Sequence, residues 1–336
     1  MVLPRYIVLE KAVGETPLSC AEAYRAEHPE LSGVPLAYAG RLDPMASGKL
    51  LVLVGEECKR QTEYHNLDKE YEFSVLFGIS SDTQDVLGRL TPANSYSTVN
   101  RTIKHSGAGV GDSNPQLGTV SRPACDSAAP SKTTPGISRH IYDSVAPPET
   151  TSDEMPQYST VNPIILSKIA AELLGVIELP YPHFSAKTVK GKPLHMWTLE
   201  GRLAEIEIPT KRSSIYTLEL VDIETVSRAQ VAALARAKID TIPPVTDMRK
   251  ALGNDFRRVA VRQDWATIAT GNGGPVPLPD TYTIAHFRCS ASSGTYMRSL
   301  AALIAQKVGT CGLAWHIHRT KIGRFDTQTH HWTHQY

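Results

Sequence analysis

The sequence predicts an α+β fold, in which strands and helices occur without a repeating β-α-β unit. Residues 69–78 and 282–289 alternate apolar and polar side chains, as half-buried strands do. Residues 205–209 and 215–221 predict two further strands. Helical spacing of apolar residues appears elsewhere in the chain, but the regular succession of strands and helices that a Rossmann fold needs is missing.

Composition narrows the class of protein. The chain has 336 residues, 41% hydrophobic and 21% charged, so it can bury a sizeable core in one large domain or two. A net charge of +1 does not by itself indicate a nucleic-acid binder, and any RNA-binding surface must come from an uneven distribution of charge. Basic residues gather near the end of the chain, at Arg288, Arg298, Lys307, Arg319, Lys321 and Arg324.

The sequence argues against disulfides, metal sites, membrane spans and a signal peptide. The five cysteines are scattered without a C-x-x-C pair, which argues against a disulfide framework and a zinc site. His330 and His331 lack further ligands at metal spacing, so we expect no metal there. No apolar run reaches the length of a membrane span, and residues 1–11 lack the pattern of a signal peptide. The expected location is the cytoplasm.

The first block of the chain, residues 1–90, starts with a strand over 7–10 and a turn over 14–17. Ser19 is then predicted to cap a helix, because a hydroxyl there can accept a bond from a free backbone N–H. This helix is expected to end before Pro29.

A single carboxylate stands on a tight turn further along this block. Asp43 followed by Pro44 predicts a helix start or a turn, since aspartate accepts backbone N–H bonds and proline presets φ. Gly48 ends the turn, and residues 50–54 predict a buried strand or a short core helix.

The next segment differs in composition. Residues 91–160 are rich in Ser, Thr, Pro, Gly and Asn and poor in apolar periodicity. Such a segment cannot bury enough surface to offset its ordering entropy, which predicts a low-complexity, disordered insertion. Regular structure returns with a helix that begins near Asn162 and ends at Gly175.

The remainder of the folded part is expected over residues 161–326, with 327–336 as a tail too short to be a domain. Residues 227–279 predict a helical insertion, in which Val231, Leu234, Ala235 and Lys238 suit an amphipathic helix. Residues 293–300 open another helix, whose apolar face is expected to include Met297, Leu300, Leu303, Ile304 and Val308.

The turn around Asp43 has a more specific pattern. It resembles the active-site motif of the TruB family of tRNA pseudouridine synthases, G-x-L-D-P-x-A-x-G, in which the aspartate is catalytic. Every fixed position of the motif matches, at Gly40, Leu42, Asp43, Pro44, Ala46 and Gly48. Ribosomal pseudouridine synthases share only the weaker R-L-D core, so Pro44 and Ala46 favour the TruB type.

Further blocks resemble the same family in the same order. Lys11 and Gly14 stand in its first motif, where Ala12 replaces the usual proline. Residues 69–88 resemble its K-x-Y strand and the T-D-T-x-D-x-x-G loop that follows, and Tyr71 matches the tyrosine that lines the base pocket.

Two blocks in the second half complete the resemblance. Residues 180–194 resemble the P-x-Y-S-A-x-K-x-x-G-x-x-L segment, with Lys187 one place before the usual basic position, which here is Thr188. Residues 289–298 resemble the motif C-S-x-G-T-Y-I-R with two extra residues before the glycine. Arg298 matches the arginine that pairs with the catalytic aspartate.

The resemblance implies a fold and a reaction. The fold is the pseudouridine synthase fold, a mixed, largely antiparallel sheet flanked by helices with a central active-site cleft. The reaction isomerises uridine to pseudouridine in the T-arm of tRNA, at uridine 55, without metal or cofactor. Asp43 either attacks ribose C1′ or stabilises positive charge there and abstracts the 2′-proton, and Arg298 holds it ionised through a bidentate pair. The remaining substrate-binding residues are Tyr71, Tyr38, Gly40, Leu42, Tyr296, Lys187 and Arg319.

Two other functions stay open. A ribosomal-RNA pseudouridine synthase is the nearest alternative, and a catalytically idle RNA-binding or RNA-folding protein is the second. The intact set of Asp43, Tyr71 and Arg298 argues against the idle protein. The expected partner is the T-arm of tRNA, with no obligate protein partner and a monomeric state. We see no room for the small RNA-binding PUA domain in which many TruB-type enzymes end.

Overall fold

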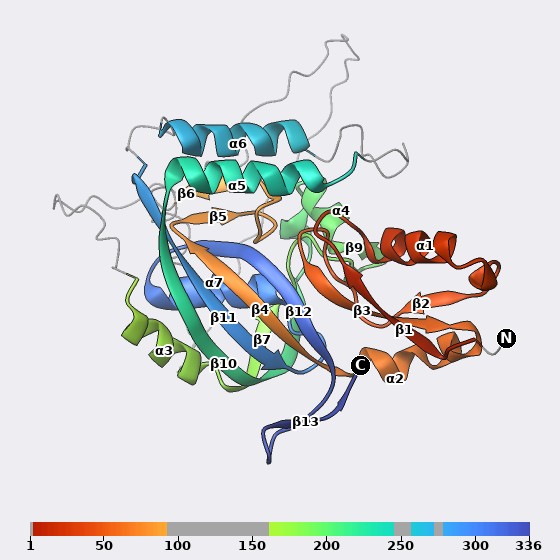
Figure 1. Ribbon diagram of the computed structural model, residues 1–336. Helices are drawn as coiled ribbons and strands as arrows, with labels where there is room; N and C mark the ends of the chain where they lie inside the picture. The colour runs from red at the N-terminus through yellow and green to blue at the C-terminus, as the bar shows by residue number, and fades with distance from the viewer. Residues whose placement is uncertain (1–2, 93–160, 245–256, 272–277) are drawn as a thin grey trace, which may run out of the picture. The chain divides into compact units, whose positions relative to one another are not determined.

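The computed structural model describes residues 3–92, 161–244, 257–271 and 278–336 (Figure 1). All of them belong to one of the two units into which the chain divides. The insertion predicted over 91–160 lies outside the described residues except at its edges, and so does part of the predicted insertion over 227–279. The partition of the chain into these segments stays a prediction.

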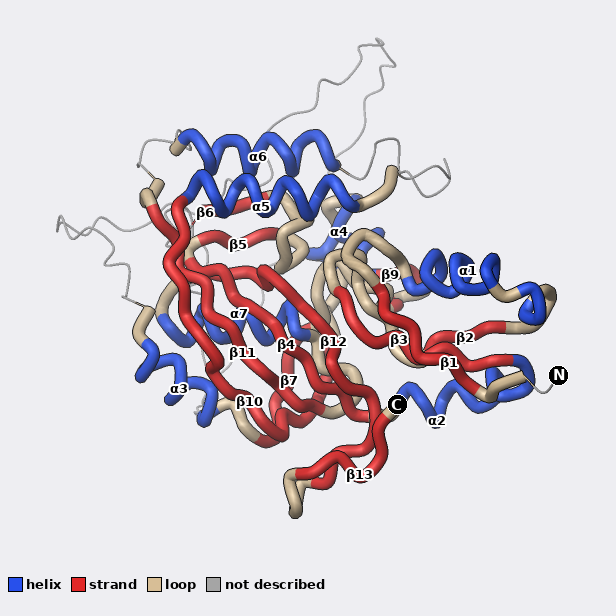
Figure 2. The backbone as a smooth tube through the Cα atoms, in the orientation of Figure 1, coloured by secondary structure: helices blue, strands red, loops and turns tan. Residues whose placement is uncertain are grey.

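One mixed sheet organises this unit (Figure 2). Its strand order is β1-β3-β12-β4-β11-β10-β7, with β2 added beside β3 and β13 beside β12. The pairs are antiparallel except β3 with β12, which is parallel. The strands are β1 Tyr6–Lys11, β2 Leu36–Tyr38, β3 Ser47–Val54, β4 Asp68–Phe77, β7 Gly175–Pro180, β10 Thr210–Ser227, β11 Thr281–Ala291, β12 Gly312–Asp326 and β13 His331–Gln335.

Two short hairpins and seven α-helices accompany the sheet in the described residues, with short 3₁₀ helices between them. The hairpins pair β5 Ile79–Ser81 with β6 Leu90–Pro92 and β8 Thr188–Val189 with β9 Lys192–Pro193. The helices are α1 Pro17–Glu27, α2 Gln61–His65, α3 Pro163–Glu172, α4 Leu194–Leu199, α5 Arg228–Thr241, α6 Arg258–Thr270 and α7 Met297–Val308. The predicted α+β class, with a largely antiparallel sheet and flanking helices, is therefore confirmed. No helix among these residues is long and apolar enough to cross a membrane.

The core lies between the central strands and α7. Figure 1 shows α7 behind β4, β11 and β12, and it shows α5 and α6 side by side above one end of the sheet. Phe73 of β4 and Phe287 of β11 stack in this core with ring centroids 5.4 Å apart. Trp265 of α6 and Trp315 of β12 meet edge to face at 6.2 Å. Burial of each such large side chain stabilises the fold by roughly 1.5–3 kcal/mol.

The structure corrects three local predictions. The strand predicted over 205–209 is absent, because Glu205 ends a short 3₁₀ helix (Leu203–Glu205) and β10 begins only at Thr210, where Pro180 of β7 first pairs with it. The helix after residue 14 is capped by Thr16 rather than Ser19: the Thr16 hydroxyl accepts the Ser19 N–H, and the Ser19 hydroxyl accepts the Thr16 N–H in return. Leu234 is 51% exposed, since α5 buries Val231, Ala232, Ala235 and Ile239 instead.

The turn that carries Asp43 is held from two sides. The N–H of Ala46 donates to the carbonyl of Asp43 at 3.0 Å, which closes the turn itself. The N–H of Gly14, just after β1, donates to the carbonyl of Pro44 at 2.8 Å. Directly after the turn, Gly48 of β3 lies against the backbone of Arg319 in the parallel pairing with β12. Of the predicted alternatives, the structure shows a turn rather than a helix start at Asp43, and a strand rather than a core helix over 50–54.

Replacing Gly48 by alanine is expected to destabilise the protein by about 2 kcal/mol or more. Gly48 has φ +105°, and a Cβ there would lie 2.6 Å from the Arg319 nitrogen and closer still to its carbonyl oxygen. Denaturant unfolding should show the loss. Gly33→Ala is the matched control, since Gly33 also has a positive φ (+73°) but a Cβ there would meet no described atom within 4 Å. Equal losses in the two variants would show that close packing on β12 is unimportant.

Candidate active site

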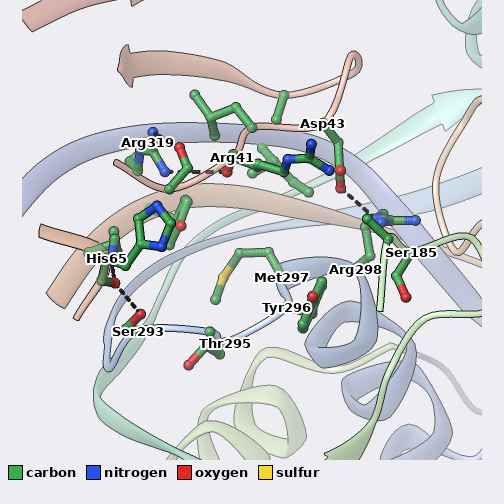
Figure 3. Close-up of a pocket in the computed structure, with 18 of the residues that line it drawn as sticks. Arg41, Asp43, His65, Ser185, Ser293, Thr295, Tyr296, Met297, Arg298 and Arg319 are labelled. Carbon is green, nitrogen blue, oxygen red and sulfur yellow. Dashed lines mark hydrogen bonds and ion pairs between the residues drawn. The ribbon is translucent and has the colours of Figure 1, made fainter. Parts of the chain in front are cut away.

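Asp43 lies on the wall of a cavity of about 620 Å³ (Figure 3). Four parts of the chain line it: residues 38–46, the stretch from α2 to the start of β4, residues 184–186, and residues 293–298 at the start of α7. Ile317 and Arg319 of β12 complete the lining. Segments far apart in the sequence thus meet at one place, and the volume is within the range typical of small-molecule sites.

The structure brings most of the predicted site residues together. Asp43 is joined in the cavity lining by Tyr38, Gly40, Leu42, Tyr71, Tyr296, Arg298 and Arg319. Lys187 lies outside the lining, although its neighbour Ala186 is part of it. Lys187 is exposed, and its ammonium group sits 5.2 Å from the centre of the Tyr181 ring.

The Arg298 guanidinium is the buried centre of the polar contacts. Its Nε lies 2.8 Å from Oδ2 of Asp43, and the dashed line in Figure 3 marks this ion pair. Its other two nitrogens donate to the carbonyl oxygens of Thr83 at 2.8 Å and Phe184 at 3.3 Å. The bidentate pair predicted with Asp43 is therefore not what the structure shows: one nitrogen binds the carboxylate, because the other two are engaged by backbone carbonyls.

Asp85 is a second carboxylate beside Arg298. It is buried, and its Oδ2 lies 3.8 Å from Nε of Arg298. Its Oδ1 accepts hydrogen bonds from the Thr83 hydroxyl at 2.6 Å and the Leu87 N–H at 2.9 Å. Burial raises the pKa of Asp85, although the Arg298 charge opposes this. The sequence analysis did not single out Asp85, but the T-D-T-x-D-x-x-G pattern of its loop was the signal that contained it.

Opposing effects also act on Arg298 itself. Burial alone would lower the pKa of its guanidinium, yet the neighbouring carboxylates of Asp43 and Asp85 raise the pKa above its ordinary value. Asp43, in contrast, is 42% exposed and faces the cavity. The arrangement presents one accessible carboxylate, oriented by a fixed cation that the surrounding loops hold in place.

Arg319 binds the backbone on both sides of the turn that carries Asp43. Its side chain is 1% exposed, and its Nε donates to the carbonyl of Lys49 at 2.7 Å. Its terminal nitrogens donate to the carbonyls of Gly40 at 3.4 Å and Arg41 at 3.5 Å. Although Arg319 lines the cavity, its donors are turned toward the backbone that carries Asp43.

Lys69 is a further buried cation in the lining that sequence reasoning did not assign. Its ammonium group donates to the carbonyl of His65 at 3.0 Å and also to the carbonyl of Leu67. Burial, together with the nearby Arg319 charge, lowers the pKa of Lys69 to about 7. Lys69 and Arg319 both lie near Gly40, whose φ of +90° favours glycine at the position before Arg41.

The rest of the wall is aromatic and hydroxylic. Tyr71 of β4 is 9% exposed, and the Tyr296 ring packs edge to face on Tyr181 with centroids 5.5 Å apart. Burial raises the pKa of the Tyr296 phenol. The Ser185 hydroxyl lines the cavity, is buried, and has no hydrogen-bond partner among the described residues. Sequence analysis placed Ser185 in a motif but gave it no role.

The described residues contain no group of His, Cys, Asp and Glu that could hold a metal ion. The described cysteines, Cys20, Cys58, Cys289 and Cys311, are free thiols. What the site offers chemically is a carboxylate, an oriented guanidinium and aromatic rings around a cavity. These groups suit reactions in which a carboxylate acts as nucleophile or base beside a stacked planar ring.

Comparison with known proteins shows which family this chain resembles. Residues 34–108 match the model of the TruB family pseudouridylate synthase, N-terminal domain. A tRNA pseudouridine synthase B from Caldicellulosiruptor saccharolyticus is 22% identical over 320 residues, covering 95% of this chain and 68% of that protein. A tRNA pseudouridine synthase 4 from Saccharomyces cerevisiae is 21% identical over 297 residues, covering 83% of this chain and 58% of that protein.

A shorter match is more similar. A tRNA pseudouridine synthase B from Borreliella burgdorferi is 41% identical over 61 residues, which cover 18% of this chain and 22% of that protein. Among solved structures, one chain of a Cbf5-Nop10-Gar1 complex is similar with a TM-score of 0.43 and 14% identity, covering 95% of this chain and 48% of that one. The chain thus spans about half to two thirds of the length of the longer matches.

The family match includes the turn with Asp43 and the strand with Tyr71, and the long alignments continue through the segment that supplies Arg298. The regions that match known proteins therefore contain the main residues of the cavity. The chain is thus similar to the TruB family of pseudouridylate synthases, over residues 34–108 by the family model and over most of its length by the relatives.

Proposed function

We propose that the protein isomerises uridine to pseudouridine in the T-arm of tRNA, at uridine 55, with Asp43 as the catalytic residue. The observation that carries the proposal is the ion pair between Asp43 and Arg298 on the wall of a cavity able to accept a nucleotide. Support for tRNA as the substrate comes from the relatives, which are named tRNA pseudouridine synthases.

The reaction breaks the bond from ribose C1′ to N1 of uracil, and uracil leaves with the electron pair. The base then turns so that C5 faces C1′, a C5–C1′ bond forms, C5 loses its proton, and N1 gains one. Asp43 either attacks C1′ or abstracts the 2′-proton. One carboxylate suffices because the uracil anion is a tolerable leaving group, whereas glycosidases generally need a second carboxylic acid to protonate theirs.

The neighbouring residues have supporting roles in this proposal. Arg298 keeps Asp43 ionised and oriented, since one guanidinium nitrogen contacts the carboxylate while the others are fixed by carbonyl groups. Tyr71 stacks on the extracted base and assists proton transfer at C5. The target uridine must leave its stack to enter the cavity, at a cost of a few kcal/mol.

The same residues bear on the two alternative functions, an idle RNA-binding protein and a ribosomal-RNA synthase. An idle RNA-binding protein has no need of an accessible carboxylate held against a buried arginine inside a cavity. A ribosomal-RNA synthase could use the same pair, but Pro44 and Ala46 and the names of the relatives favour tRNA. The cytoplasmic location, the monomeric state and the absence of an obligate protein partner stay predictions.

An isolated T-arm hairpin is expected to react nearly as well as whole tRNA. The reason is that Asp43, Arg298 and Tyr71 all line one cavity, and a stem-loop alone is enough to bring the target uridine into it. Release of tritium from RNA labelled at uridine C5 measures the reaction, and a hairpin with cytidine at position 55 is the control. Modification of ribosomal RNA helices by an enzyme that leaves the T-arm hairpin untouched would establish the ribosomal alternative instead.

A further inference from the structure

The cations near the end of the chain do not form the free basic surface that the sequence indicated. Arg298 and Arg319 are buried, at 4% and 1% exposure. Arg324 is exposed and has no ion pair among the described residues, but the other three cations are paired with acidic side chains on neighbouring elements. These ion pairs are Arg288 with Glu72, Lys307 with Glu172 and Lys321 with Glu70. An RNA backbone therefore finds most of its positive partners elsewhere on this unit.

Cations without an acidic partner occur at the cavity itself. Arg41 is exposed and lines the cavity, and it has no ion pair among the described residues. Lys187 and Lys211 likewise have none. Figure 3 shows Arg41 on the wall that carries Asp43, across the cavity from Thr295 and Tyr296. The two lysines lie next to that second wall.

Lys211 reaches the second wall from β10. It pairs in register with Leu179 of β7, and its side chain runs along Gly294, which lines the cavity. A Cβ on Gly294 would lie 2.6 Å from Cε of Lys211 and 3.4 Å from Nζ. The positive φ of Gly294, +83°, and the absence of a side chain let the lysine lie across this lip.

Lys187 reaches the same wall through two aromatic rings. Its ammonium group lies 5.2 Å from the centre of the Tyr181 ring, and Tyr181 packs on Tyr296 of the cavity wall. The N–H of Tyr181 donates to the carbonyl of Pro209 at 3.1 Å, two residues before Lys211. The segments that carry Lys187 and Lys211 are thus tied together beside residues 294–296.

We propose that Lys187 and Lys211 bind the backbone phosphates that flank the nucleotide held in the cavity. A uridine inserted there remains joined to the RNA through a phosphate on each side, and these phosphates must lie at the rim. Unpaired lysines at the rim attract them, and phosphate contacts fix the register of the RNA without reading its sequence. This inference rests on the proposed function, because it takes RNA as the molecule that enters.

The test is binding of a T-arm hairpin to the double variant Lys187→Ala/Lys211→Ala over a range of salt concentrations. We expect weaker binding and a log–log salt slope reduced by about one for each lysine lost. The control is Lys168→Ala/Arg236→Ala, which removes two exposed cations that have no ion pair among the described residues, on α3 and α5, away from the cavity lining.

A neutral linkage in the RNA makes the test specific. When the phosphates flanking the target uridine are replaced by methylphosphonates, the double variant and the unaltered protein should bind equally. An unchanged salt slope, or an equal loss in the control variant, would overturn the inference. A persisting difference on the neutral hairpin would place the lysines on other phosphates and overturn it too. If the unaltered protein converts no uridine in any hairpin, the proposed function fails instead.

Discussion

Asp43→Asn is expected to abolish pseudouridine formation while the RNA still binds. The asparagine has nearly the shape of the carboxylate but can neither attack C1′ nor take the 2′-proton, so both routes are closed. The Arg298 contact at 2.8 Å becomes a contact to a neutral amide, which leaves the guanidinium charge less compensated. Tritium release from labelled T-arm hairpin measures turnover, and fluorescence anisotropy of the same hairpin measures binding.

The matched control for this variant is Asp82→Asn, on the loop that supplies Thr83 and Asp85. Asp82 pairs with Arg257 and is not part of the cavity lining. It should therefore keep most of the activity. Turnover of Asp43→Asn above a few per cent of the unaltered protein would show that another group performs the chemistry. Loss of hairpin binding together with loss of turnover would point to a role in holding the RNA instead.

Arg298→Lys is expected to lower turnover by about a hundredfold or more. The arginine serves three acceptors at once, namely Asp43 and the carbonyls of Thr83 and Phe184. A lysine ammonium on a shorter, flexible stem cannot meet all three in this geometry. Preorganised charge contacts of this kind account for about 10²–10³ in rate when one is removed. Single-turnover rates at saturating hairpin give the effect directly.

Folding must be separated from chemistry in this variant, because buried carbonyl groups left without donors each destabilise the fold by about 1–3 kcal/mol. Thermal unfolding of Arg298→Lys should show that the variant is folded at the assay temperature. Arg288→Lys is the control, since Arg288 is exposed and pairs with Glu72 on the sheet, outside the cavity lining. A single-turnover rate for Arg298→Lys within tenfold of the unaltered protein would refute the orienting role.

The local sequence pattern was enough to predict those elements whose structure depends on neighbouring residues. Alternation predicted β4 and β11, and the Asp43-Pro44 pair predicted the turn, because strand faces and turn backbones depend on neighbouring residues. The prediction of a strand over 205–209 was wrong. A strand needs a partner, and the neighbouring strand β7 pairs only with residues from Thr210 onward. Ser19 was misread as a cap because both members of a capping box are hydroxyl residues, and only the geometry assigns Thr16.

By itself, the sequence determined the α+β class, the family motifs and most of the residues that meet at the cavity, Asp43, Tyr71 and Arg298 among them. The tertiary structure decided what each cation does. Arg298 contacts Asp43 through one nitrogen, Arg319 binds the turn backbone, and Lys211 lies across the glycine at the rim. A charge in a sequence has no partner until the sheet brings strands from distant parts of the chain together. Burial and pairing, which set its role, therefore follow from the fold.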